Sequence, residues 1–104
     1  MGGPTAKANP DAAARSRLDK WLWQARFFKT RAEAAEIIGK GRVRVNGQRM
    51  SKPGHGIAAG DVLTFAPGDR IRVIRIAALG VRRGPFSEAQ MLYIDMDVAP
   101  TPLE

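Results

Sequence analysis

Apolar residues recur at helical spacing early in the chain. At positions i, i+3, i+4, i+7 and i+10 stand Leu18, Trp21, Leu22, Ala25 and Phe28. They form one continuous apolar stripe, because residues three and four apart share one side of an α-helix. This spacing predicts a helix over residues 16–27, with its stripe facing the core.

Two aromatic side chains of this helix lie away from the stripe. Phe27 is predicted to pack beneath the following helix, and Trp23 beneath the C-terminal tail. A second interpretation makes Trp23 a stacking surface for an RNA base, a contact worth about 1–3 kcal/mol. The pattern favours packing and leaves stacking open.

A second helix begins with the signature of a capping box. Thr30 is a good N-cap residue, and Glu33 stands three positions on, where it can bond back to the cap. The apolar positions that follow are Ala34, Ala35, Ile37 and Ile38. Gly39 and Gly41 are predicted to end the helix, one of them in the left-handed conformation.

The pattern then changes to strand alternation. Val43 and Val45 alternate with Arg42 and Arg44, so that one strand face is apolar and the other basic. Asn46-Gly47 follows directly. This dipeptide predicts a type I′ hairpin turn, because both central positions of that turn need positive φ.

Two further strands are predicted after turn signals. Gly60-Asp61 precedes a strand over Val62–Phe65, and Pro67-Gly68-Asp69 precedes one over residues 70–76. In the second strand, Ile71 and Val73 alternate with Arg70 and Arg72, and Ile74 interrupts this alternation, which predicts a bulge there.

Near the end, Ser87-Glu88-Ala89-Gln90 repeats capping-box chemistry and predicts a short third helix through about Met96. The predicted organisation is a flexible arm over residues 1–15, an α+β domain over 16–80, an extension with a short helix over 81–98, and a disordered tail over 99–104.

Charge is concentrated in one segment of the chain. The net charge is +7, and residues 15–52 contain eleven Lys and Arg against three Asp and Glu. Such a concentration on one folded unit favours a polyanionic partner. The chain has no cysteine and no apolar run of about 18 residues, and its first residues lack the apolar core of a secretion signal. These features predict a cytoplasmic protein that does not bind membranes.

Groups for catalysis or metal binding are sparse. The single histidine, His55, stands in a Gly-rich loop with no acid nearby in the sequence, and Asp95 and Asp97 lack further oxygen ligands or a glycine of a calcium loop. No nucleotide-binding motif is present. The sequence therefore predicts a protein that is not an enzyme and that binds no cofactor or metal.

The basic residues instead predict a phosphate-binding surface. If the two helices pack side by side and the hairpin follows on, their charges can share one surface, to which the N-terminus of the second helix adds unpaired N–H groups. The alternative for any single basic residue is that it has no binding role and only keeps the surface of a small protein hydrated. The candidate RNA-binding residues are Arg17, Lys20, Arg26, Lys29, Arg31, Arg42, Arg44, Gln48, Arg49 and Lys52.

These residues resemble a known module. The chain is similar to the S4-type RNA-binding domain over about residues 16–65, at Arg17-Leu18-Asp19, Lys29-Thr30-Arg31, Ala35, Ile38, Gly41, Val43, Val45-Asn46-Gly47 and Gly60-Asp61. More narrowly, Arg17 to Trp23, Arg26-Phe27, Arg82-Arg83, Ser87-Glu88-Ala89 and Leu92-Tyr93 resemble the family of the fifteen-kilodalton ribosome-associated heat-shock protein of bacteria.

The resemblance implies the αL motif, which is an αα-hairpin packed on a small, curved, mainly antiparallel sheet. It also implies a protein that binds ribosomal RNA on large ribosomal subunits stalled with a nascent chain on tRNA, and that aids their recycling under heat stress. Separately from the resemblance, the protein is expected to be a monomer. Transfer RNA and single-stranded nucleic acid are further candidate partners. Two alternatives stay open: a remnant of an RNA-modifying enzyme, and a ribosome-associated adaptor that binds proteins through its apolar C-terminal segment.

Overall fold

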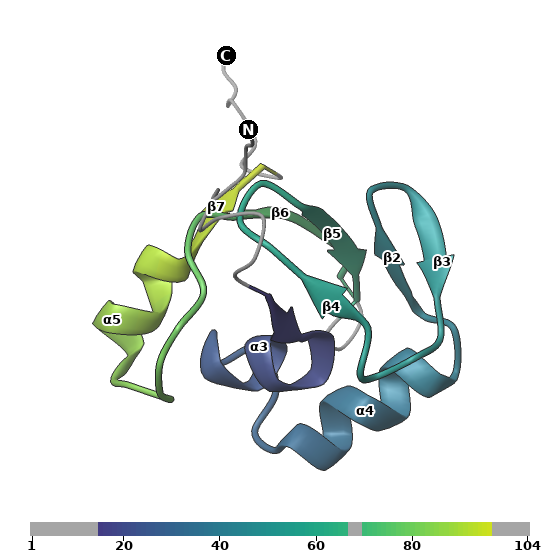
Figure 1. Ribbon diagram of the computed structural model, residues 1–104, viewed down its shortest axis with the longest axis horizontal. Helices are drawn as coiled ribbons and strands as arrows, with labels where there is room; N and C mark the ends of the chain where they lie inside the picture. Colours follow the sequence, from purple (N-terminus) through teal and green to yellow (C-terminus); the bar gives the residue numbers. More distant parts are fainter. Residues whose placement is uncertain (1–14, 67–69, 97–104) are drawn as a thin grey trace, which may run out of the picture.

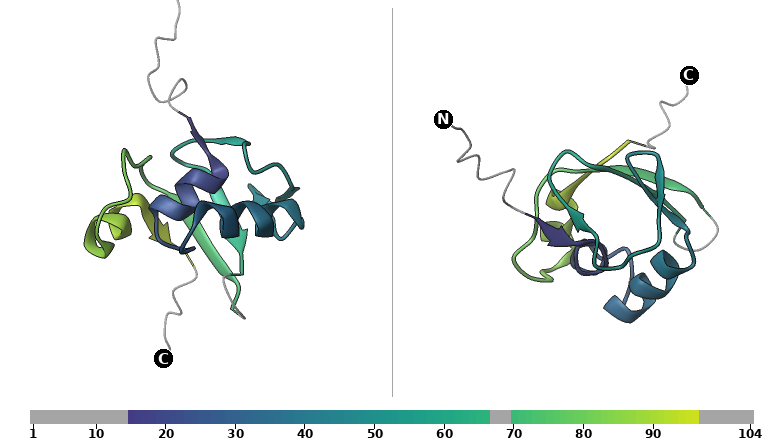
Figure 2. Two further views of the ribbon diagram at one scale, coloured as in Figure 1. Left: turned by 90° about the horizontal axis from the view of Figure 1, so that it is seen from below. Right: turned by 45° about the vertical axis from the view of Figure 1, so that its right-hand side comes forward.

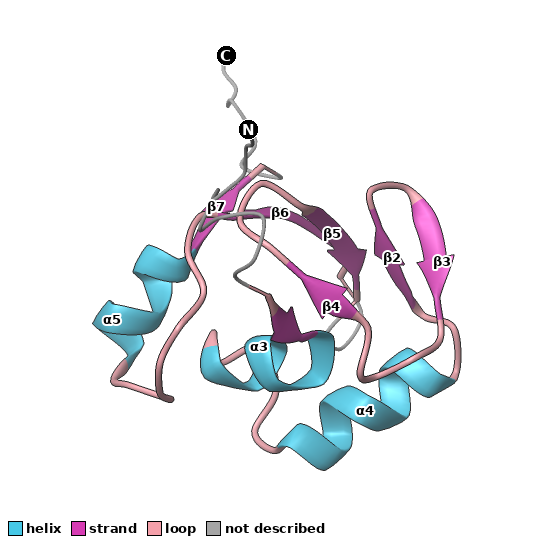
Figure 3. Cartoon of the chain, in the orientation of Figure 1, coloured by secondary structure: helices cyan, strands magenta, loops and turns pink. Residues whose placement is uncertain are grey.

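In the computed structural model, residues 15–66 and 70–96 are described. The predicted arm up to residue 14, the turn at Pro67-Gly68-Asp69 and the tail after residue 96 lie outside this part of the chain. Two helices lie side by side beneath a curved antiparallel sheet, and a short helical segment stands at one end (Figure 1). The predicted α+β class is confirmed, and Figure 3 shows how helices and strands separate into two layers.

The first helix is shorter than its apolar stripe predicted. Helix α3 spans Leu18–Gln24, and the two residues before it form strand β1, Ser16–Arg17. The prediction of a helix over residues 16–27 was therefore wrong at both ends. Arg17 is extended (φ −66°, ψ 140°) because β1 pairs with β4, Gly56–Ile57. Arg26 has φ 66°, a left-handed conformation that ends the helical path.

The second helix confirms its capping signal. Helix α4 spans Arg31–Gly39, and the Thr30 side chain accepts a hydrogen bond of 3.0 Å from the Glu33 N–H. The Glu33 carboxylate bonds back to the N–H of Lys29 at 3.1 Å, one residue before the predicted position. Gly41 is the left-handed glycine after the helix, with φ +74°.

The main sheet has five antiparallel strands in the order β3-β2-β5-β6-β7. The strands are β2 (Val43–Val45), β3 (Gln48–Met50), β5 (Val62–Phe65), β6 (Arg72–Ile76) and β7 (Tyr93–Asp95). Asn46 and Gly47 have φ 53° and 84°, which confirms the predicted turn between β2 and β3. In Figure 2, α3 and α4 cover one face of this sheet, and the strands curl around the core.

Strand β6 runs in the opposite phase to the one predicted, and without a bulge. Its register with β5 is continuous, and Leu63 stands directly opposite Ile74. Ile74 and Ile76 are buried, while Ile71 is exposed before the strand begins. The predicted alternation, with Ile71 and Val73 facing the core, was wrong because Ile74 and Ile76 fill the core instead.

The C-terminal helix ends earlier than predicted. Helix α5 spans Phe86–Ala89 with Pro85 at its N-cap, and one 3₁₀ turn, η1 (Gln90–Leu92), follows. The predicted Ser87 capping box and the helical continuation to Met96 were wrong. The chain becomes extended at Tyr93 because pairing with Ile76 adds β7 to the edge of the sheet.

The core lies between α3, α4 and the concave side of the sheet. Leu18, Trp21 and Leu22 are fully buried, as the stripe predicted. Phe27 packs against the sheet, with its ring 5.0 Å from that of Phe65 and 4.7 Å from that of Tyr93, and it lines a hollow together with Glu33 and Ile37 of α4. This packing anchors the turn that positions α4 beside α3.

Candidate nucleic-acid interface

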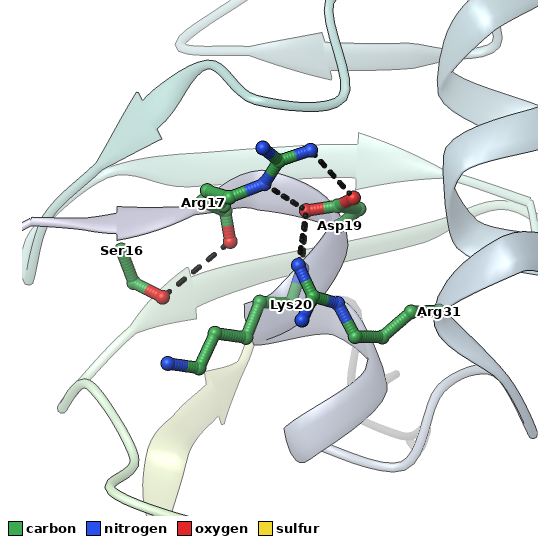
Figure 4. A network of polar contacts seen from close by, with 5 residues as sticks. All are labelled: Ser16, Arg17, Asp19, Lys20 and Arg31. Atoms are coloured by element: carbon green, nitrogen blue, oxygen red, sulfur yellow. Dashed lines mark hydrogen bonds and ion pairs between the residues drawn. The ribbon is translucent and has the colours of Figure 1, made fainter.

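A buried carboxylate joins two arginines at the start of the helices. Asp19 is only 4% exposed and accepts hydrogen bonds from Arg17 Nε at 3.0 Å and Arg17 Nη2 at 3.1 Å. Arg31 Nη2 lies 3.7 Å from the same carboxylate. Figure 4 shows the two guanidinium groups approaching Asp19 from different elements, β1 and α4. Both arginine side chains stay about half exposed, at 55% and 44%.

The carboxylate is charged because of its partners. Burial alone raises the pKa of Asp19, but the hydrogen bonds from Arg17 and from the Lys20 N–H, with the charges of Arg17 and Arg31, together lower that pKa below its usual value. In turn, the hydrogen bond to Asp19 and its charge raise the pKa of Arg17. The result is a fixed cationic pair on the surface above one buried anion.

Backbone pairing explains the position of Arg17. The Leu18 N–H donates to the His55 carbonyl at 2.9 Å, and the Asp19 N–H donates to the Pro53 carbonyl at 3.1 Å. The loop before β4 therefore takes the first N–H groups of α3, which would otherwise be unpaired. The Arg17 guanidinium lies against Gly54 of the same loop. That loop also carries Lys52, which is exposed.

The other helix-side candidates differ in what they contact. Lys20 and Lys29 are exposed, and the Lys20 side chain points away from the network in Figure 4. Arg26 is also exposed, but its Nε donates to the Gly84 carbonyl at 2.7 Å. Part of the Arg26 guanidinium is thus used to tie the C-terminal connector to the end of α3.

Trp23 is covered on one side by this connector. The guanidinium of Arg83 lies 5.6 Å from the Trp23 ring and donates through Nε to the Trp23 carbonyl at 3.0 Å. Arg83 Nη2 is also 3.4 Å from the Phe28 carbonyl. Trp23 remains half-buried, so packing accounts for one side of the ring and the stacking interpretation is limited to the other.

The hairpin arginines do not share the surface around Asp19. Val43 and Val45 are buried in the core, so Arg44 between them points to the side of the sheet away from the helices. Arg49 stands directly opposite Arg44. Gln48 pairs with Val45 and belongs to the inner face, although it is exposed at the hairpin end. The predicted convergence of all the basic residues on one surface therefore does not occur.

Asp19 is the residue that reasoning from the sequence missed. It was counted as an acid within a basic segment, although its spacing already contained a signal. An aspartate two residues after an arginine and in the first turn of a helix is placed to accept from backbone N–H groups. Its contact with Arg31 depends on α3 and α4 lying side by side, which is a tertiary feature.

Residues 15–66 and 70–96 contain no group of three or more His, Cys, Asp or Glu side chains that could hold a metal ion. In the same residues, no helix has the length and apolar character needed to cross a membrane.

Comparison with known proteins identifies the family. The model of the S4 domain matches residues 16–63. A solved structure described as trimeric heat shock protein 15 of Vibrio cholerae superposes with a TM-score of 0.76 and 39% identity, covering 81% of this chain and 84% of that one. The chain belongs to the heat shock protein 15 family. The family resemblance inferred from the sequence is thus confirmed.

Two curated relatives extend this result. Heat shock protein 15 of Escherichia coli K12 is 48% identical over 81 residues, which are 78% of this chain and 60% of the relative. The chain therefore spans about three-fifths of that protein's length. A Listeria innocua protein named RQC P-site tRNA stabilizing factor is 40% identical over 67 residues, 64% of this chain and 72% of the relative.

Proposed function

We propose that this protein binds structured RNA of the ribosome without catalysing a reaction, through the surface around Asp19. The observation that carries the proposal is the fixed cationic pair. A buried carboxylate positions Arg17 and Arg31 from two different elements, and both guanidinium groups keep exposed N–H donors. Arginine side chains held in this way match phosphate oxygens. Long basic side chains favour recognition of RNA shape and backbone over base sequence.

The finer proposal concerns which ribosomes are bound. We propose large subunits stalled with a nascent chain on tRNA, in the cytoplasm, with the protein aiding their recycling under heat stress. The names of the Listeria and Escherichia relatives support this proposal. Co-sedimentation with empty and stalled large subunits, before and after nuclease treatment, tests it. Equal binding to both kinds of subunit would contradict the finer proposal, and nuclease-resistant association would contradict RNA binding.

The oligomeric state is a separate question. The monomer expected from the sequence stays a prediction, whereas the solved Vibrio relative is described as trimeric. Sedimentation equilibrium of the free chain, repeated with RNA at stoichiometric amounts, decides between the two states.

The electrostatic mechanism predicts a strong salt dependence. If six to eight phosphates are neutralised, the slope of log K against log salt concentration should be about −4 to −7, because each contact releases condensed counterions. Fluorescence anisotropy with a labelled ribosomal RNA fragment, titrated across salt concentrations, measures the slope. A nearly flat dependence would contradict binding through phosphates.

Replacing Arg31 by glutamine should weaken RNA binding about tenfold, because one charge-assisted contact is lost. The melting temperature should stay near that of wild type, because the Arg31 side chain is 44% exposed and Asp19 keeps its two hydrogen bonds from Arg17. Lys40→Gln is the matched control, because Lys40 also lies at an end of α4 and forms one exposed ion pair. If affinity falls equally in both variants, general charge rather than the Asp19 pair determines binding.

A further inference from the structure

The sheet has a second face that the helices do not cover. Strand alternation turns one set of side chains away from the core, and we call this surface the outer sheet face. It carries four exposed arginines, which the helix-side site does not use, and several aliphatic side chains between them. Its members are Arg42, Arg44, Arg49, Val62, Thr64, Ile71, Val73, Arg75 and Ile94.

The strand register arranges these residues in rows. Arg49, Arg44, Thr64 and Val73 stand directly opposite one another across four strands. In the next row, Arg75 lies between Val62 and Ile94. Like charges directly opposite each other, such as Arg44 and Arg49, destabilise a strand pair. An anion held between the two arginines would remove this cost.

No described acid offsets the charge of this face. None of the residues of this face is acidic, and none of the four arginines forms an ion pair with another described residue, in contrast to Arg17 and Arg31. Their hydrogen bonds are few. Arg49 Nε donates to the Gly41 carbonyl at 3.2 Å, and Arg44 Nη1 lies 3.5 Å from the Gly47 carbonyl. The other N–H groups of these fork-shaped side chains remain as donors for a partner.

A hollow lies beside the arginines. It has a volume of about 270 Å³ and is lined by Gly41, Arg42, Arg44, Thr64, Phe65, Ala66 and Ile71. Small-molecule sites usually measure about 300–1,000 Å³, so the hollow suits one base or phosphate of a longer strand. Its lining combines apolar residues with two arginines, which are the residue types that suit the base and the phosphate of a nucleotide.

We propose that the outer sheet face binds a single RNA strand, separately from the structured RNA held at Asp19. Alternate residues of a strand lie about 7 Å apart, which is close to the separation of successive phosphates on an extended RNA strand. Arg42 and Arg44 can therefore contact neighbouring phosphates. The inference rests on the proposed function and extends it, because the domain then bridges two RNA segments, one on each side.

A two-probe capture experiment tests the bridge. A biotinylated RNA hairpin on beads is saturated with the full chain, and a labelled oligouridine of about twelve nucleotides is added at low salt. Wild type should capture the strand. Arg44→Gln should stay on the hairpin beads as wild type does but capture about tenfold less strand, because it loses one charge-assisted contact. Arg82→Gln is the matched control, since it removes one arginine from the connector and should not change capture.

Each outcome is distinct. If wild type does not bind the hairpin, the proposed function fails. If wild type binds the hairpin but captures no strand, or Arg44→Gln captures as much as wild type, the outer sheet face is not a second RNA site. If Arg44→Gln leaves the hairpin as readily as Arg31→Gln, all charges serve one RNA and the bridge is wrong. A glutamate peptide that displaces the strand as well as unlabelled oligouridine would assign the face to acidic protein segments instead.

Discussion

Replacing Asp19 by alanine should weaken RNA binding about tenfold, although the substitution removes a negative charge from a basic protein. The reason is that Asp19 aligns Arg17 and Arg31. Without the carboxylate, the two guanidinium groups repel each other, and each must be ordered again when RNA binds. Ordering a long side chain costs about 0.5–1.5 kcal/mol, so two such side chains account for the expected loss.

Net charge alone predicts the opposite change in RNA affinity, so the Asp19→Ala variant separates the two explanations. If Asp19 only reduced the net charge, the alanine variant would bind RNA more tightly than wild type. Asp19→Ala should also lose about 1–2 kcal/mol of stability, since the Lys20 N–H and Arg17 lose their acceptor. Binding is therefore measured by anisotropy well below the melting temperature, with the folded fraction checked by circular dichroism. Unchanged or higher affinity of the folded variant would contradict a positioning role.

The same carboxylate predicts a pH dependence of stability. Its pKa is lower in the folded than in the unfolded chain, so protonation favours unfolding. The stabilisation is complete above the unfolded-state pKa of about 4 and is lost as the pH falls through the folded-state pKa. Urea unfolding of wild type and Asp19→Asn measures this effect. The difference in unfolding free energy between wild type and Asp19→Asn should shrink as the pH falls from neutral to about pH 3. A difference that does not change with pH would mean that the Asp19 side chain stabilises the fold through its shape and not through its charge.

The local signals in the sequence predicted most of the scaffold. The stripe of α3, the Thr30 cap and the Asn46-Gly47 turn each depend on residues close in the chain. Such signals are set by backbone conformation and by nearest-neighbour contacts. They correctly give α3, α4, the hairpin of β2 and β3, and β5 in order, and with them the family resemblance, but not the short strand β4, which was expected to be a loop.

The wrong secondary-structure predictions concern segments whose conformation is set by pairing with distant parts of the chain and not by their local sequence. Ser16–Arg17 leaves the helical pattern because β4 pairs with it, and Tyr93 leaves the C-terminal helix because β6 offers a free edge. In β6, the inward-facing residues are set by pairing with β5, which places Ile74 opposite the buried Leu63, and not by the local alternation of apolar and basic residues.

The candidate site was likewise predicted only in part, because its geometry depends on tertiary packing. Basic residue types were visible in the sequence, but the two faces on which they lie depend on packing. Val43 and Val45 enter the core and turn Arg44 away from Arg31. The network around Asp19 requires α3 and α4 to be in contact, and no pattern within one helix contains that information.

Replacing Trp21 by alanine should cause the largest loss of stability. Trp21 is fully buried, and its Nε1 donates to the Ala78 carbonyl at 3.0 Å. Truncating a buried tryptophan costs about 3–5 kcal/mol. A domain of this size has only about 5–15 kcal/mol in total. Urea unfolding followed by far-ultraviolet circular dichroism should therefore show a strong decrease in the midpoint, or a partly unfolded chain in buffer.

Trp23→Ala is the matched comparison, because Trp23 lies two residues away in the same helix and is only half-buried. It should lose the contact with Arg83 and cost about 1 kcal/mol, far less than Trp21→Ala. Similar losses in the two variants would contradict the assignment of Trp21 to the core. The same variant decides the role of Trp23 in binding. Unchanged RNA affinity supports packing against Arg83, whereas a loss of about fivefold or more, equivalent to about 1 kcal/mol, would assign the open side of the ring to base stacking.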